Sequence, residues 1–239
     1  EYYIMLKNVL IIFALCSLFI NSTFGGTLSG RVNFDGKSPK KRSLKMDADP
    51  VCGSSHKEPV YKQDFIINEA GYLKNVMVYL KDVKYEGKTP ETKAVLDQNG
   101  CMYSPHILGM FKGQELLIKN SDATLHNIHG LPTINSGFNF AMPKVVKEKA
   151  IKIVKPEHAI KIKCDVHSWM KAYVSVFDHP YFTVTNDSGY YQIDNIPPGT
   201  YEVIAWQEKF KDKTLNSSVT IGDGETNNNF TFVRKEKKK

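Results

Sequence analysis

Short apolar runs rich in β-branched and aromatic residues recur along most of the chain, and turn residues separate them. Runs of this kind are typical of strands, and no long stretch shows the 3.6-residue apolar repeat of a helix. Asn99-Gly100, Ser188-Gly189 and Pro197-Pro198-Gly199 supply turn chemistry between the runs. The pattern predicts an all-β protein built from antiparallel sandwiches. Examples of the predicted strands lie at 28–34, 76–80, 115–119, 150–154, 159–163, 172–177, 201–206 and 230–233.

The N-terminal stretch has the pattern of an export signal. Lys7 precedes an apolar run at 9–20, and the small residues Gly25 and Gly26 follow it. The run is shorter than the roughly 20 apolar residues that a membrane span needs. We predict a signal peptide at 1–25, export to the periplasm or the extracellular space, and no transmembrane segment in the mature chain.

The distribution of charge along the chain indicates which kind of partner to expect. The 239-residue chain has a formal net charge of +7, and the tail at 234–239 contains five positive residues and one negative residue. The rest of the chain is therefore only mildly basic, and it shows no basic stripe interleaved with aromatic residues. Nucleic-acid binders concentrate their cations on one face. We expect no nucleic acid as partner, whereas a mildly basic body favours an acidic protein surface.

Export also changes the interpretation of the cysteines, because disulfides persist in oxidising compartments. Once Cys16 is removed with the signal peptide, Cys52, Cys101 and Cys164 remain. Cys52 and Cys101 both lie in turn-like sequence, so we predict that they form a structural disulfide, with two free thiols as the alternative. Cys164 is then left for another role.

Cys164 begins a compact group of soft ligands, Cys164-x-x-His167-x-x-Met170. Thiolate, imidazole and thioether suit copper that alternates between two oxidation states. An electron-transfer copper site joins two histidines and one cysteine to a weak axial methionine. The histidine missing from the loop is supplied by His126, which follows a predicted strand and turn far upstream. One loop and one distant strand would then fix the geometry of the site.

These residues resemble a known family. The segment 112–122 followed by His126-Asn127 resembles the first ligand segment of cupredoxins, and the Cys-x-x-His-x-x-Met loop has the spacing of the short-loop, amicyanin-like members. The resemblance spans roughly residues 92–177, and it implies a Greek-key cupredoxin sandwich at 81–178 that holds one type 1 copper ion. The copper ligands that it implies are His126, Cys164, His167 and Met170.

The resemblance also implies roles for two neighbours of these ligands. Asn127 would brace the ligand loop through hydrogen bonds near the thiolate. Trp169 would lie beside His167, whose imidazole edge is expected near the surface as the point where the electron leaves.

Two alternatives to this ligand set stay open. His129, three residues after His126, could be the ligand in its place. His106 and His56 follow Cys101 and Cys52, and these four residues could form a second metal site, because Cys/His spacings of this sort occur in zinc sites.

The C-terminal part carries a second resemblance. A strand, an Asp/Gly turn, a second strand, a Pro-Pro-Gly turn and a third strand follow one another over 182–203. This order resembles the carboxypeptidase regulatory-like sandwich, which has a transthyretin-like architecture. It implies a small β domain at 179–233 that serves as a scaffold or docking module. The N-terminal β segment at 26–80 either contributes strands to this domain or extends the cupredoxin sandwich, and a basic tail occupies 234–239.

The sequence thus predicts an exported single-copper electron carrier, not an enzyme, whose redox partner has an acidic docking face. One alternative is a copper storage or delivery protein that uses the same ligands. Another is a cell-surface carbohydrate-binding-like module without a redox role. A copper enzyme would need a second, histidine-rich centre, and the remaining histidines show no such grouping.

Overall fold

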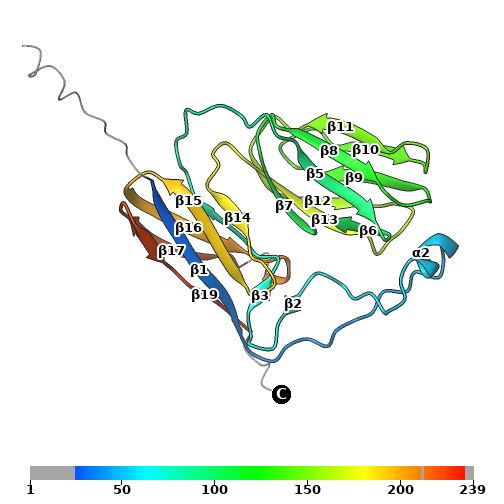
Figure 1. Cartoon of the computed structure of the whole chain (residues 1–239), viewed down its shortest axis with the longest axis horizontal. Coiled ribbons are helices and arrows are strands. Elements are labelled where there is room, and N and C mark those ends of the chain that lie inside the picture. The colour runs from blue at the N-terminus through cyan, green and yellow to red at the C-terminus, as the bar shows by residue number, and fades with distance from the viewer. Residues whose placement is uncertain (1–24, 211–212, 235–239) are drawn as a thin grey trace, which may run out of the picture.

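The computed structural model describes residues 25–210 and 213–234, and the fold that it shows is all-β, as predicted (Figure 1). The only helices in this part of the chain are α2 (Pro50–Ser54) and the short 3₁₀ helix η1 (Glu208–Phe210). The predicted signal peptide and basic tail fall outside the described residues, apart from Gly25 and Arg234. Within the described ranges, neither helix has the length or apolar character to cross a bilayer.

The middle of the chain forms a sandwich of two sheets around one apolar core. Alternate residues of each strand face inward, and Leu96, Ile118, Ile128, Ile162 and Val174 are fully buried in this core. The first sheet has the order β10 (Phe138–Met142), β9 (His126–Leu131), β12 (Glu157–Lys163), β13 (Lys171–Phe177) and β7 (Ile107–Phe111). The second has the order β11 (Glu148–Lys152), β8 (Glu115–Asn120), β5 (Ala94–Asn99) and β6 (Met102–Ser104).

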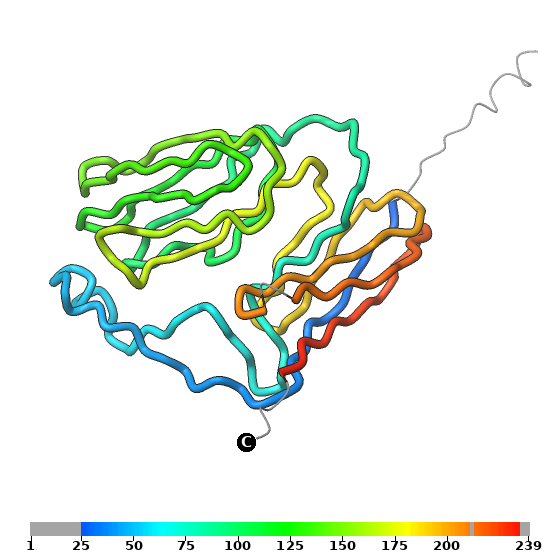
Figure 2. Tube along the Cα trace, turned by 180° about the vertical axis from the view of Figure 1, so that it is seen from behind, coloured from blue at the N-terminus to red at the C-terminus, as the bar shows by residue number. Residues whose placement is uncertain are grey.

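A second sandwich combines strands from both ends of the described chain. One sheet has the order β15 (Tyr190–Ile196), β1 (Gly26–Asp35) and β18 (Glu225–Asn227), and β19 (Phe230–Val233) also pairs with β1. The other has the order β14 (Phe182–Val184), β4 (Met77–Leu80), β16 (Gly199–Trp206) and β17 (Leu215–Ile221). The N-terminal strands β1 and β4 therefore pair with C-terminal strands, and the first sandwich lies between β4 and β14 in sequence (Figure 2).

A long arm, residues 36–72, extends from the second sandwich to the first and back again. Figure 1 shows it leaving β1, passing along the first sandwich to α2, and returning to the small sheet of β2 (Ile66–Ile67) and β3 (Leu73–Lys74). Its two limbs are paired through an isolated bridge between Ser43 and Tyr61. The arm thus carries α2 far from the sandwich to which its own ends belong.

The predicted disulfide fastens the end of this arm. Cys52 of α2 is bonded to Cys101, which lies in the turn between β5 and β6. Gly100 and Cys101 both have positive φ, 61° and 55°, and Asn99 pairs with Met102 across them. This is the type I′ geometry of a two-residue hairpin turn, which requires positive φ at both central positions and is easily adopted by glycine. The turn holds the sulfur of Cys101 toward the arm.

Candidate metal centre

Three residues of the predicted ligand set, His126, Cys164 and His167, meet at one end of the first sandwich, and Met170 lies in the same loop as two of them. His126 is the first residue of β9, whereas Cys164, His167 and Met170 lie in the loop that joins β12 to β13. The backbone closes this loop tightly. The N–H of His167 donates to Cys164 Sγ (3.3 Å), and the N–H of Met170 donates to the carbonyl of His167 (3.0 Å). The two ends of the loop are fixed in addition by the antiparallel pairing of β12 with β13.

Three donor atoms converge within the buried interior. The Nδ1 atoms of His126 and His167 are 2.9 Å apart, and Nδ1 of His167 is 3.8 Å from Cys164 Sγ. The three side chains form a group whose potential ligand atoms all lie within 4.8 Å of one another. All three residues are buried, and Met170, 1% exposed, belongs to the same core. Two imidazole nitrogens and one thiolate of this kind match the strong ligands of an electron-transfer copper site.

Two aspartates hold the far sides of the imidazole rings. His126 Nε2 lies 2.8 Å from Asp122 Oδ2, and His167 Nε2 lies 3.1 Å from Asp49 Oδ2. An Nε2–H that donates to a carboxylate leaves the Nδ1 lone pair free for a metal, and the carboxylate also fixes the plane of the ring. Both rings therefore direct the same atom toward Cys164.

These aspartates are themselves held in place. Asp122 accepts hydrogen bonds from the backbone N–H groups of Gly100 and Cys101, each at 2.8 Å. Asp49 caps α2 by accepting from the N–H of Val51, and its second oxygen accepts from Thr124 Oγ1 (2.8 Å). We did not predict either aspartate. Asp122 could have been suspected because it lies in the turn before His126, but nothing in the sequence links Asp49 to His167.

The electrostatics of the group favour a cation. Burial raises the pKa of the Cys164 thiol, but hydrogen bonds from His126 and from backbone N–H groups, including that of Asn127, outweigh this effect and lower it. Burial alone would lower the pKa of His126, but Asp122 and Cys164 raise it to about 9. For His167, burial and the neighbouring charge of His126 outweigh the opposing effect of Asp49 and lower the pKa. The group thus combines a thiol and two carboxyls of lowered pKa with one imidazole, that of His126, of raised pKa.

Asn127 connects the strand that carries His126 to the ligand loop. Its side-chain oxygen accepts from the N–H of Asp165, and its Nδ2 donates to Asn139 Oδ1 (2.6 Å) and to Asp165 Oδ2 (3.3 Å). The backbone carbonyl of Asn127 accepts from the hydroxyl of the buried Tyr103. These contacts fix the residue next to Cys164, which is the position that the expected bracing role requires.

The structure places the alternative ligands elsewhere. His129 lies three residues along β9 from His126, where side chains point to the opposite face, and it contacts Asp165 Oδ2 at 2.8 Å. His106 lies between the carbonyl of Lys171 and Glu208 Oε1, both at 3.1 Å, and His56 contacts the carbonyl of Gly100. A second site with Cys52 and Cys101 as thiolates does not form, because the two sulfurs are bonded to each other.

The expectation that an edge of His167 lies near the surface is wrong. His167 is only 2% exposed, because the arm covers it with Asp49 and with Cys52, whose Sγ is 3.7 Å from Nε2. The Trp169 ring packs against the other side of His167, with ring centroids 4.9 Å apart, and its Nε1 donates to the carbonyl of Cys101. Trp169 is half-buried and lines a cavity of about 160 Å³. Trp169 therefore contacts both this histidine and the cavity.

Comparisons with known proteins give partial likenesses. A family model described as polysaccharide lyase family 4, domain II, matches residues 153–229, which is about a third of the chain. No curated protein matches the sequence. Among solved structures, a reduced mutant of amicyanin is 18% identical with a TM-score of 0.33, and the match covers 38% of this chain and 87% of that one.

Two further solved structures are similar to the same extent. A purple cupredoxin from Nitrosopumilus maritimus is 20% identical with a TM-score of 0.31, over 36% of this chain and all of that one. The copper-containing nitrite reductase from Thermus scotoductus is 19% identical with a TM-score of 0.32, over 41% of this chain. The match spans only a quarter of that reductase.

Proposed function

We propose that the chain is an exported electron carrier that holds one copper ion at one end of the first sandwich. His126, Cys164 and His167 would be the strong ligands and Met170 the weak axial one. The observation that carries the proposal is the convergence of two imidazole Nδ1 atoms on a buried cysteine sulfur, with both Nε2 atoms held by carboxylates. Bound copper would supply a one-electron couple, and the donor set suits both of its oxidation states.

The surroundings of the donors support electron transfer in preference to metal delivery. The ligands lie at strand ends and in a closed loop of a packed core, so their positions change little when the charge of the site changes. The disulfide-anchored arm excludes water from His167. A delivery protein would instead need a ligand open to the receiving protein. The burial of all three strong ligands therefore favours the carrier.

We propose Trp169 as the exit, because it contacts His167 and lines a cavity that opens between the arm and the first sandwich. Lys62 and Lys171 also line this cavity. Their positive charge would attract a redox partner with an acidic docking face. The proposed division into domains follows the sheets, with 81–178 as the copper unit and 179–233 completed by strands from 26–80.

The optical spectrum of the copper-loaded protein tests the proposal. Transfer of charge from the Cys164 thiolate to copper should colour the protein intensely, and voltammetry should show one reversible one-electron wave. Cys164→Ser should abolish the colour, because a hydroxyl does not replace a thiolate as a soft ligand. His129→Gln is the matched control, and it should keep the colour because His129 lies outside the donor group.

Circular dichroism on both variants would show that the fold is retained. A colourless copper complex of the unaltered protein would contradict the proposal. So would colour that survives in Cys164→Ser.

A further inference from the structure

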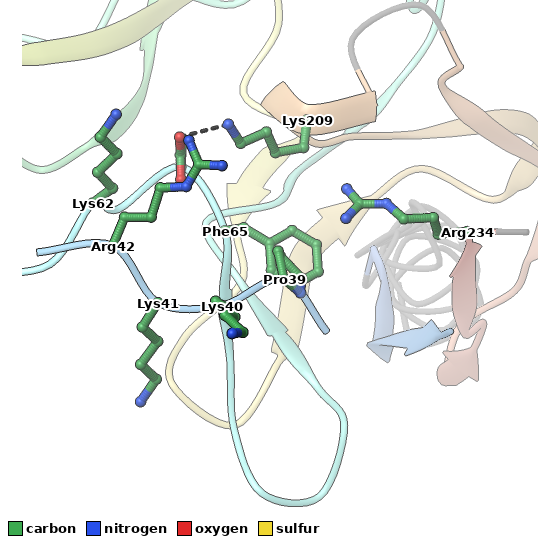
Figure 3. Close-up of a pocket in the computed structure, with 9 residues that line it drawn as sticks. Pro39, Lys40, Lys41, Arg42, Lys62, Phe65, Lys209 and Arg234 are labelled. Atoms are coloured by element: carbon green, nitrogen blue, oxygen red, sulfur yellow. Dashed lines mark ion pairs between the residues drawn. The ribbon is translucent and has the colours of Figure 1, made fainter. Parts of the chain in front are cut away.

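A cleft of about 270 Å³ lies at the base of the arm, away from the donor group. Figure 3 shows its lining, to which both limbs of the arm, η1 and the end of β19 contribute. Most of the lining side chains are cationic, and one is a carboxylate. The charged residues of the lining are Lys40, Lys41, Arg42, Lys62, Asp64, Lys209 and Arg234.

The positive charge of this cleft is neutralised only in part by carboxylates of the protein. Among the described residues, only Lys209 of the six cations forms an ion pair with a carboxylate, at 2.6 Å from Asp64. Burial raises the pKa of Asp64, but Lys209, Lys171 and Lys62 outweigh this effect and lower it, so the carboxylate stays ionised. The lining therefore contains six cations and a single carboxylate. Bringing like charges together from separate segments costs free energy that a bound anion would offset.

Arg234 is held in position for such an anion. Its guanidinium lies over the rings of Phe34, Phe65 and Phe210, with distances to the ring centroids of 5.9, 5.6 and 5.5 Å. Its backbone N–H donates to the carbonyl of Asp35 (3.0 Å). Packing against aromatic faces stabilises the guanidinium while leaving its N–H donors free.

The opposite wall is ordered as well. The N–H of Lys62 donates to the carbonyl of Arg42 (3.0 Å), which places these two cations on neighbouring limbs of the arm. Gln207 Nε2 donates to the carbonyl of Asp64 (2.8 Å), which fixes the returning limb to the second sandwich. Figure 3 shows the Arg42 and Lys209 side chains approaching each other and Arg234 directed toward Phe65, whereas Lys41 points away.

We propose that this cleft is a binding site for a small polyvalent oxyanion of the phosphate or sulfate class. The forked guanidinium groups of Arg42 and Arg234 can each bond two oxygens of a tetrahedral anion, and Lys40 and Lys62 add positive charge. The cleft volume equals that of about nine water molecules, which is enough for a diphosphate. A concave site of this size fits a compact anion better than the flat acidic face of a protein. The proposal does not depend on copper.

Titration of the full-length protein with inorganic pyrophosphate at physiological salt tests the site. We expect saturable binding and a rise in melting temperature, because the anion would bridge the arm and the second sandwich. Arg42→Gln combined with Lys62→Gln should weaken binding about tenfold or more. Both side chains are exposed, so the fold should be retained. The matched control is Lys144→Gln with Lys155→Gln, which removes the same charge from exposed positions outside the cleft.

A second variant separates charge from geometry. Arg234→Lys keeps the positive charge but loses the forked pair of donors. If the guanidinium bonds the anion directly, this variant should bind pyrophosphate more weakly. If charge alone attracted the anion, the affinity would stay unchanged. Inorganic phosphate and vesicles containing a phosphomonoester lipid, tested alongside, distinguish a free anion from a headgroup as the source of the group.

Three outcomes would overturn the proposal. The first is the absence of saturable pyrophosphate binding at millimolar concentration. The second is equal weakening in the cleft variant and in the control variant, which would mean diffuse attraction to a basic surface. The third is binding of a poly-glutamate peptide without binding of pyrophosphate, which would identify the cleft as a docking surface for an acidic protein instead.

Discussion

Asp49 and Asp122 determine which nitrogen each histidine presents to the donor group. Each accepts a bond from an Nε2 atom, and each is fixed by further donors, from α2 in one case and from the β5–β6 turn in the other. Without such partners, an imidazole can turn over or carry its proton on the wrong nitrogen. The proposed site therefore depends on two acidic residues that would not themselves touch the metal.

Asp122→Asn should lower the copper affinity of the protein by 10- to 100-fold, which is the usual effect of losing such a carboxylate. The amide keeps the size of the side chain but removes the charge and one acceptor oxygen. Competition with a chromophoric chelator measures the affinity. Asp223→Asn, at an exposed position, is the control. An unchanged affinity in Asp122→Asn would show that the carboxylate does not position His126.

At the scale of elements, the arm is the unusual part. It leaves β1 of the second sandwich, yet its helix α2 lies against the ligand loop of the first, and one disulfide anchors it there. A short helix with a single buried residue, Cys52, has little apolar surface to hold it in place. The helix is instead held in place by the disulfide, by the pairing of the two limbs of the arm and by the hydrogen bonds of Asp49.

Replacing Cys52 and Cys101 together by serine should release the arm. The bond links residues 49 positions apart, and loss of a cross-link over such a loop costs about 4 kcal/mol of unfolding free energy in the chain-entropy model. Chemical denaturation measures this change. Release of Asp49 should also expose His167, so bound copper should pass to an external chelator faster. Retention of the original transfer rate would show that the arm does not protect the site.

At the scale of the whole molecule, the two sandwiches also meet directly. Met77, Ile107, Phe177 and Trp206 form a small buried cluster between them. The ring of His158 lies beside this cluster, 5.1 Å from Tyr79 and 5.2 Å from Trp206 by ring centroids, and its Nδ1 contacts Ser175 Oγ (3.0 Å). Its buried Nε2 has no hydrogen-bond partner within the described part of the chain. A charge on this ring would be unfavourable.

Burial lowers the pKa of His158 to about 4. The unfolded chain binds the proton near pH 6.5, so the folded state loses stability as the pH falls from 6.5 to 4, by about 3 kcal/mol at most. His158→Phe should flatten this part of the pH profile of unfolding free energy, because phenylalanine keeps the aromatic packing without a proton site. His56→Gln, at an exposed position, should not. An unaltered acid slope in His158→Phe would contradict this assignment.

Strand positions were largely predictable from local pattern. Three of the predicted strands, at 28–34, 115–119 and 172–177, correspond to β1, β8 and β13 with small differences at the ends. They could be predicted because alternate residues of a strand face the core, which produces an apolar pattern within a short stretch of sequence. A strand that carries His126 was expected, but its bounds were not predicted, since the sequence of β9, His126–Leu131, mixes two histidines, an asparagine and a glycine with apolar residues. Of its inward positions, only Ile128 is an apolar core residue, because His126 belongs to the donor group and Gly130 has no side chain.

The sequence by itself determined the class of fold, the soft-ligand loop and the two cysteines available for a bridge, because each of these depends on residue types and spacing within a short stretch. Only the tertiary structure decided that Asp49 lies on His167, that this histidine is covered, and that cations from four segments surround one cleft. Such contacts join residues far apart in the chain. They depend on how the disulfide-anchored arm lies against the first sandwich. A local pattern of polar and apolar positions does not determine the course of that arm.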